Sequence, residues 1–211
     1  MMNSRYSDKV ARLLALCGVT APVLMLVLWT LASLVRPGYN QLNQYGSELG
    51  TGPNAIIMDA NFFVTGLLII GFAGGLFRSI HGGKWAGAGS TLLAVFGAGE
   101  AAGGLFPCDP GCPVAAQSFS QLAHNVDAVV ALVALTLAPL IVSPSLKRDG
   151  YWQRYRAYCL VTGLATVALF STFSVASLGY LGSVGLLQRL FLAVPFLWIE
   201  VMATKLLRAP S

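Results

Sequence analysis

The chain of 211 residues is 56% hydrophobic and only 10% charged, with a mean hydropathy of +0.71. Soluble domains carry about 25% charged residues, so this composition excludes an ordinary soluble globular protein and favours a membrane protein. The net charge of +5 does not indicate nucleic-acid binding, because the cations lie in particular gaps between apolar stretches, where they report membrane orientation.

Six apolar stretches are each long enough to cross a hydrocarbon core of about 30 Å as a helix. In chain order they cover residues 13–35, 55–77, 86–106, 119–142, 157–178 and 185–206. Runs this continuous differ from the weak alternation of a membrane barrel, and a helix satisfies its own backbone hydrogen bonds in lipid. We therefore predict an all-α, polytopic six-transmembrane-helix bundle that forms a single domain over residues 1–211.

The cations predict the orientation of these spans. Of the 13 Lys and Arg residues, all but Arg36 and Arg189 lie at the span ends that share one side. By the positive-inside rule, that side and both termini are cytoplasmic. The first apolar run is longer than the apolar core of a signal peptide, about 7 to 15 residues. We predict a multi-pass protein of the cell (inner or plasma) membrane that contacts anionic inner-leaflet lipid.

Five ionisable side chains lie at comparable depth in the outer halves of four spans. They are Asp59, Glu100, His124, Asp127 and Arg189. A charge at the bilayer centre costs at least ~2.5 to 3.5 kcal/mol, so such groups face the bundle interior and find partners. Because Arg189 is the only Lys or Arg among them, we predict that it pairs with a carboxylate of Asp59, Glu100 or Asp127.

Helical spacing supports an inward face for two of these spans. Residues at intervals of three and four share one stripe of a helix, and one such stripe holds Gln117, Gln121, His124 and Asp127, with Asn125 at its edge. Glu100 shares its face with small residues that allow close helix packing. We predict an outward-facing, ligand-binding pocket formed by the five ionisable side chains and Asn125. A structural tether is the alternative for each charge taken singly.

Two outer loops add polar groups near the predicted pocket. The first spans residues 36–54 and is longer than most structureless loops in compact domains. It would either fold over the bundle as a lid, with Glu48 near the pocket, or lie in the interface anchored by Tyr39 and Tyr45.

The third interspan loop contains two cysteines that flank an Asp-Pro-Gly turn. Cys108 and Cys112 are predicted to form a disulfide, because the outer compartment is oxidising and the turn brings the sulfurs together. A zinc site and a redox-active pair remain as alternatives.

The order of motifs along the chain resembles a known family. They are RPGY at residues 36–39, SELG at 47–50, Asn54, FPCDPGCP at 106–113, His124-Asn125 and Gln188-Arg189-Leu190. Together they resemble the bacterial membrane family known as domain of unknown function 998. The resemblance implies a six-helix bundle without an agreed biochemical role. A shorter pattern, the first-loop motif followed by a His in a later span, resembles the eukaryotic group that contains the damage-regulated autophagy modulators and Frag-one. This second resemblance would imply a function in lipid handling.

Three classes of function follow from these residues. The first, which we favour, binds or handles a lipid headgroup or small polar ligand in the pocket. The second is an intramembrane hydrolase or transferase, in which His124 is the base, Asp127 or Asp59 orients it and Ser120 is the nucleophile. A metal-dependent version would hold a divalent ion at Glu100, His124 and Asp127.

The third class is a structural membrane subunit whose polar interior fixes helix register. The sequence leaves open whether the protein is an enzyme. Membrane lipid is the predicted partner in each class, and homo-oligomerisation or a partner membrane protein is compatible with all three.

Overall fold

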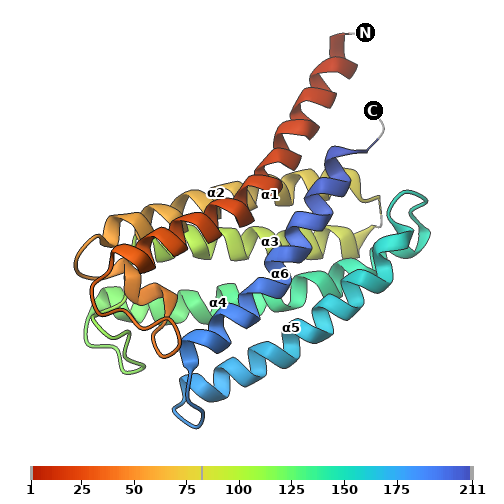
Figure 1. Ribbon diagram of the computed structural model, residues 1–211. Coiled ribbons are helices and arrows are strands. Elements are labelled where there is room, and N and C mark those ends of the chain that lie inside the picture. The colour runs from red at the N-terminus through yellow and green to blue at the C-terminus, as the bar shows by residue number, and fades with distance from the viewer. Residues whose placement is uncertain (1, 82, 210–211) are drawn as a thin grey trace.

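Six α-helices make up most of the chain in the computed structural model (Figure 1). They are α1 Met2–Val35, α2 Ala55–Ser79, α3 Lys84–Gly103, α4 Phe119–Val142, α5 Arg156–Ser177 and α6 Val184–Leu207. Three short 3₁₀-helices, η1 Gly46–Gly50, η2 Ser143–Arg148 and η3 Gln153–Tyr155, lie between them. The structure describes residues 2–81 and 83–209, with the side chains of 2–8 and 148 left out, so the side chains of Arg5 and Arg148 lie outside the description. In that part of the chain there is no β-strand, which confirms the all-α prediction.

Five of the helices are long and apolar enough to cross a membrane: α1, α2, α4, α5 and α6. Their outward surfaces are apolar; for example, Leu26 is 69% and Phe119 is 76% exposed. Such a surface is suited to contact with lipid, whereas contact with water would be unfavourable. The helix α3 lies outside this set because its glycines, its serine and Glu100 lower its hydropathy. Membrane-spanning helices are therefore present, and the sixth span stays a prediction.

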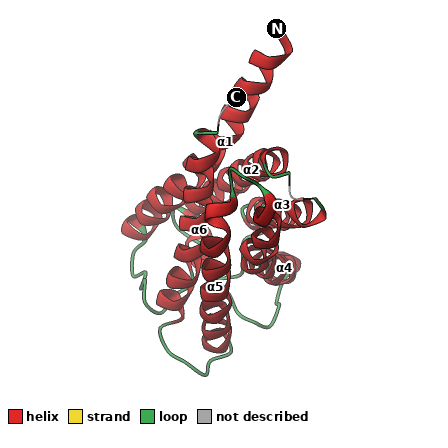
Figure 2. Ribbon diagram, turned by 90° about the vertical axis from the view of Figure 1, so that its right-hand side faces the viewer, coloured by secondary structure: helices red, strands yellow, loops and turns green. Residues whose placement is uncertain are grey.

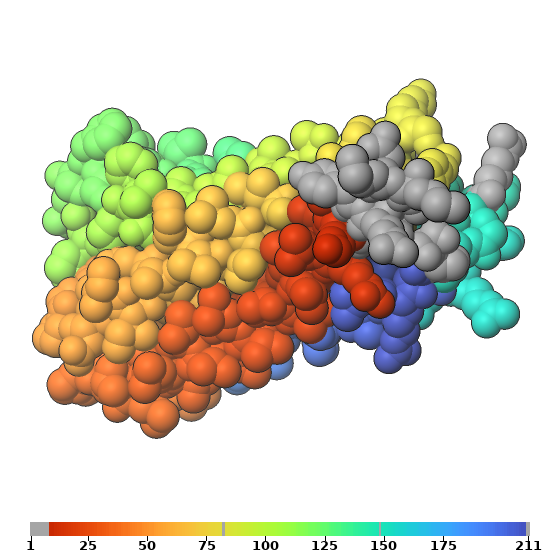
Figure 3. Space-filling view, turned by 90° about the horizontal axis from the view of Figure 1, so that it is seen from above, coloured from red at the N-terminus to blue at the C-terminus, as the bar shows by residue number. Residues whose placement is uncertain are grey.

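The helices pack in chain order around a closed ring. Each helix lies against its neighbours in sequence, and α6 closes the ring against α1 (Figures 1 and 2). Viewed from above, α1 and α2 lie side by side along one face (Figure 3). The N-terminal part of α1 projects beyond the bundle, and α1 also contains Pro22, which lacks the N–H needed for the helical hydrogen bond.

Alternate loops gather at the same end of the bundle. Loop one (residues 36–54) and loop three (residues 104–118) lie at the left of Figure 1, and the α5–α6 connection (residues 178–183) lies at its lower left. The α2–α3 and α4–α5 connections lie at the other end, toward which both termini point. We call these the loop-one end and the terminal end.

Close contact between α2 and α3 depends on glycine. A Cβ atom on Gly97 of α3 would lie only 2.7 Å from the carbonyl oxygen of Gly66 on α2. Real Cβ atoms do not approach that closely, so the two backbones meet only because neither position carries a side chain. This contact fixes α3 inside the bundle, with Glu100 one turn further along the same helix.

Candidate functional site

A cavity of about 450 Å³ lies at the loop-one end, between the helices and under the loops. Its polar lining consists of Ser47, Glu100, His124, Asn125, Asp127, Ser174, Ser177 and Gln188. Its aromatic lining consists of Trp29, Tyr45, Phe62, Phe170 and Phe173. The lining comes from every helix of the ring and from both loop one and loop three. Four of the predicted site residues lie here, namely Glu100, His124, Asn125 and Asp127.

Glu100 of α3 and Asp127 of α4 both line the cavity where these two helices pack together. A Cβ on Gly99 would lie 2.8 Å from Oδ1 of Asp127, and one on Gly103 would lie 3.8 Å from its Oδ2. The absence of side chains at these glycines makes room for the Asp127 carboxylate beside Glu100. The Oε2 atom of Glu100 is buried and has no hydrogen-bond partner among the described residues. An ionised carboxylate is costly in this position, so Glu100 is either protonated or needs a partner that the described residues do not supply.

His124 and Asn125 connect the cavity wall to loop three. Nδ1 of His124 lies 3.0 Å from the carbonyl oxygen of Phe106, and Nδ2 of Asn125 donates to the carbonyl of Val114 at 2.9 Å. The Asn125 oxygen accepts from Gln121 at 2.7 Å. Both residues therefore hold loop three against α4 while they line the cavity.

Arg189 does not form the predicted ion pair within the described residues. Its Nη1 donates to the carbonyls of Gln41 at 2.7 Å and Gly185 at 2.9 Å, and its Nη2 donates to the Tyr39 hydroxyl at 2.8 Å. The guanidinium also lies 4.8 Å from the centre of the Trp29 ring. Loop one brings carbonyls and an aromatic face to the start of α6, and these satisfy the planar donor fork without a carboxylate. Arg189 is therefore a clasp between loop one and α6, outside the cavity lining.

Tyr39 completes this clasp. Burial raises the pKa of its hydroxyl, although the neighbouring Arg189 acts in the opposite direction. The hydroxyl thus stays protonated at neutral pH, donating to the carbonyl of Tyr45 at 2.9 Å while it accepts from Arg189. The RPGY and Gln188-Arg189-Leu190 motifs are in contact with each other here.

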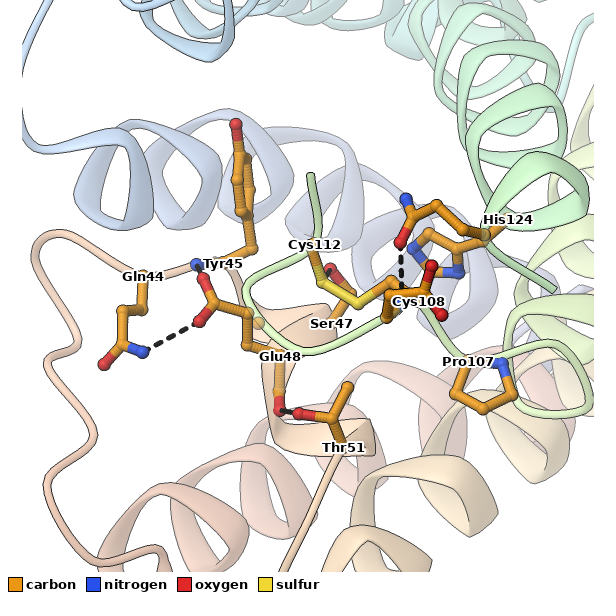
Figure 4. Close-up of a disulfide and its surroundings, with 12 residues drawn as sticks. Gln44, Tyr45, Ser47, Glu48, Thr51, Pro107, Cys108, Cys112 and His124 are labelled. Carbon is orange, nitrogen blue, oxygen red and sulfur yellow. Dashed lines mark hydrogen bonds between the residues drawn. A yellow bond between two sulfur atoms is a disulfide. The ribbon is translucent and has the colours of Figure 1, made fainter. Parts of the chain in front are cut away.

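Glu48 is buried in loop one and is not part of the cavity lining. Its Oε1 accepts from the backbone N–H of Tyr45 at 3.0 Å and its Oε2 accepts from Gln44 at 2.8 Å (Figure 4). These bonds form a capping box that closes η1. The predicted ligand-facing role of Glu48 is replaced by a structural one, because both carboxylate oxygens are used within the loop.

Loop one nevertheless covers the cavity. Gly46 and Ser47 line it, and the Gly46 N–H donates to Gln188 of α6 at 2.7 Å. Ser47 Oγ lies 3.4 Å from Sγ of Cys112 in loop three. Cys108 and Cys112 lie at disulfide distance, with their Cα atoms 5.1 Å apart, as predicted (Figure 4). The two loops therefore contact each other beside the cavity that both of them line.

Asp59 lies on α2, outside the cavity lining. Its Oδ1 is buried without a hydrogen-bond partner in the described part of the chain, and a Cβ on Gly50 would lie 2.6 Å from it. The Asp59 carboxylate therefore faces the last residue of η1 in loop one rather than Glu100 and Asp127.

The arrangements that the enzyme hypotheses require are not formed by these side chains. The Ser120 hydroxyl donates to the carbonyl of Pro107 at 2.7 Å, and Ser120 does not line the cavity. Among the residues that the structure describes, no group of three or more His, Cys, Asp and Glu is placed to hold a metal ion. His124 and the two carboxylates thus line one cavity without forming a ligand set.

Several lining residues were not among the predicted site residues. On α5 they are Phe170, Phe173, Ser174 and Ser177, and on α6 Gln188. The α5 residues recur at intervals of three, one and three, which is one face of a helix, so a search for polar stripes without charges would have found Ser174 and Ser177. Gln188 adjoins Arg189 and carries the hydrogen bond to loop one.

Comparison with known proteins gave one match. The family model described as a protein of unknown function, DUF998, matches residues 19–205. No curated protein and no solved structure matches the chain. The likeness to the autophagy modulator group stays a prediction.

Proposed function

The chain belongs to the family of proteins of unknown function DUF998, and we propose that its cavity binds a lipid headgroup or small polar ligand that carries a cationic group. The observation that carries this proposal is the charge of the lining. Glu100 and Asp127 are both acidic, and no Lys or Arg lies among the lining residues that the structure describes. Arg189 is the only Lys or Arg that the sequence placed in the pocket, and its guanidinium instead binds loop one.

The remainder of the lining fits an amphipathic cation. Five aromatic residues surround the cavity, and aromatic faces attract ammonium groups by about 0.5 to 2 kcal/mol each. Val129 and Leu178 also line it and are 64% and 66% exposed, so the cavity reaches the apolar outer surface of the bundle. An amine or quaternary ammonium headgroup would lie against Glu100 and Asp127, with its apolar part directed toward that surface.

The membrane orientation belongs to the same proposal. We place α3 as a sixth span and both termini in the cytoplasm, so that the cavity opens toward the outside. Support comes from loops one and three at one end of the bundle and from the concentration of cations at the terminal end. A disulfide between Cys108 and Cys112 fits an oxidising outer compartment.

Binding of two probes of opposite charge tests the cavity. Octyltrimethylammonium and octyl sulfate would be titrated into the protein in a neutral maltoside detergent, with tryptophan fluorescence as the readout, because Trp29 lines the cavity. We expect the cation to bind at least about tenfold more tightly than the sulfate, a difference of about 1.4 kcal/mol. The double variant Glu100→Gln with Asp127→Asn keeps the volume and should lose this preference.

Asp59→Asn is the matched control, because Asp59 is also an acid of the outer half but lies outside the cavity lining. It should keep the preference for the ammonium probe. Equal binding of the two probes by the unmodified protein would contradict the proposal, as would an equal loss in the control.

A further inference from the structure

A second and larger cavity, about 820 Å³, lies at the terminal end of the bundle. The first turns of α1 after residue 8, the end of α2 and the end of α6 form its walls, together with the two connections at that end. The two cavities share no lining residue and lie toward opposite ends of the bundle.

Basic side chains from three helices line this second cavity. They are Lys9 and Arg12 of α1, Arg78 of α2 and Arg208 at the end of α6. Lys9 and Arg12 are three residues apart and share one face of α1. None of the four forms an ion pair among the side chains that the structure describes. Four cations thus surround one space, and their mutual repulsion favours an anion within it.

The one acidic residue of the lining is already engaged. Oδ1 of Asp149 accepts from the backbone N–H groups of Tyr151 and Trp152 at 3.0 and 3.1 Å, and Oδ2 accepts from that of His81 at 3.4 Å. Asp149 therefore caps its own turn and fixes it to the α2–α3 connection. It leaves the charge of the cavity positive.

Helix dipoles account for part of this pattern only. Arg78 and Arg208 lie at the C-terminal ends of α2 and α6, where a cation complements the negative end of the macrodipole. Lys9 and Arg12 lie toward the N-terminal part of α1, where a dipole gives no such reason for a cation. The positive-inside rule accounts for the side on which the four cations lie, and a bound anion would account for their convergence on one cavity.

The other wall of the cavity is apolar. Leu14, Leu206 and Leu207 line it, with Trp152 buried alongside. Trp152 is held by a hydrogen bond from its indole to Ser79 at 3.1 Å, and Tyr151 by one to the carbonyl of Lys205 at 2.8 Å. A site with cations on one side and leucines on the other suits a phosphate group attached to an apolar body.

We propose that this cavity is a binding site for a phosphate group, carried by an anionic membrane lipid or free in solution. Arginine guanidinium groups bind phosphate oxygens by charge-assisted, bidentate hydrogen bonds. The inference is independent of the proposed function, because it concerns the opposite end of the bundle and a ligand of the opposite charge.

Native mass spectrometry of the full chain in a neutral detergent tests this site. Phosphatidylglycerol and phosphatidylcholine would be titrated separately, and bound lipid counted per protein. We expect phosphatidylglycerol to bind preferentially. The double variant Arg12→Gln with Arg78→Gln should weaken that binding about 30-fold, because each cation near an anionic lipid contributes about fivefold. Both side chains are exposed, so their replacement leaves the core intact.

The matched control is Arg154→Gln with Arg156→Gln, two exposed cations of the same end that do not line the cavity. This variant should bind phosphatidylglycerol as the unmodified protein does. An equal loss in both double variants would show general surface attraction and would overturn the proposal, as would binding without headgroup preference.

Inorganic phosphate distinguishes the two sources of the anion. If millimolar phosphate displaces phosphatidylglycerol from the unmodified protein, the cavity recognises the phosphate group by itself and the free ion is a ligand. If it does not, while the cavity variant still loses the lipid, the site requires the lipid body as well. Both results support a phosphate site, whereas phosphatidylglycerol binding that is unchanged in the Arg12 and Arg78 variant overturns it.

Discussion

Arg189 joins two distant parts of the chain through three hydrogen bonds and an aromatic face. It contacts Gln41 and Tyr39 in loop one and Gly185 on its own helix. Only a planar guanidinium presents donors in several fixed directions at once, so lysine is not an equivalent residue at this position. A second pair of contacts, Gly46 to Gln188 and Leu42 to Leu186, lies beside it.

We predict that Arg189→Lys loosens loop one without unfolding the bundle. Hydrogen bonds to charged groups contribute about 1.5 to 3 kcal/mol each, so losing one or two should speed amide exchange in residues 37–52 by tenfold or more. Hydrogen–deuterium exchange with peptide resolution measures this. Arg154→Lys, at an exposed position of the other end, serves as control. Unchanged exchange in loop one would show that the clasp is dispensable.

At the scale of the helices, the packing of α3 against α4 positions the acidic pair. Gly99 of α3 lies directly against Ala131 and Asp127 of α4. The glycines that lower the hydropathy of α3 also let it pack closely against α4. This packing leaves the space in which Glu100 and Asp127 face one cavity. Glycine in this helix is a packing requirement, as small residues often are between membrane helices.

We therefore predict that Gly99→Ala separates α3 from α4. The added Cβ would lie 2.5 Å from that of Ala131 and 2.8 Å from Oδ1 of Asp127, so one helix must shift. Overpacking of this kind costs about 1 to 3 kcal/mol. Thermal unfolding in detergent should show a lower midpoint, and binding of octyltrimethylammonium should weaken.

Gly74→Ala is the matched control, since a Cβ at Gly74 has no neighbour within 4 Å and alanine favours the helix. Its midpoint should be unchanged or higher. Equal midpoints for the two variants would mean that α3 and α4 are not in close contact in the membrane.

The whole molecule has opposite charge at its two ends. The cavity at the loop-one end is acidic and lies beneath two contacting loops, whereas the cavity at the terminal end is surrounded by cations. Lys205 also lies at the terminal end, 3.3 Å from the centre of the Tyr151 ring, and the Oε2 atom of Glu200 is buried without a partner among the described residues. Arg78 lines the second cavity, and Lys205 lies against the rings of Tyr151 and Tyr155. Neither cation forms an ion pair with Glu200 among the described side chains.

Cysteine accessibility tests the proposed orientation and the sixth span together. In a variant with Cys17 and Cys159 replaced by alanine, single cysteines would be placed at Asn40, Gln117, Tyr180 and Gln153, all exposed positions outside the six α-helices. We expect a membrane-impermeant maleimide to label the first three of these cysteines in intact cells, and Gln153→Cys only after permeabilisation. Labelling of Asn40→Cys but not Gln117→Cys would show that α3 does not cross the membrane, because α2 and α3 are the only α-helices between these two positions.

Much of the fold was predictable because lipid imposes a local rule on sequence. A backbone in hydrocarbon must satisfy its hydrogen bonds within the segment, so apolar runs of sufficient length become helices. The predicted stretches match the six helices, although α3 ends at Gly103 rather than at Phe106. The Asp-Pro-Gly turn likewise predicted that Cys108 and Cys112 lie together.

Side-chain partners were less predictable, because they depend on where the loops fold. The stripe on α4 placed His124 and Asp127 toward one cavity, yet Gln121 of the same stripe accepts from the backbone of Asp109 in loop three. Asp59 and Arg189 have similar depth to Glu100 in the sequence, but they face loop one instead. The position of a residue along its helix determines how deep its side chain lies in the bundle, but not which neighbouring helix or loop the side chain faces.

The sequence by itself determined the all-α class, the apolar helices and the proximity of Cys108 and Cys112, since each depends on residues within one short segment. Only the tertiary structure decided which polar groups share a cavity and which hold the loops. Loop one folds back onto α6 and supplies the acceptors that Arg189 takes, and this leaves Glu100 and Asp127 as an acidic pair. Such long-range competition for a cation depends on the complete packing of the chain, which no local pattern encodes.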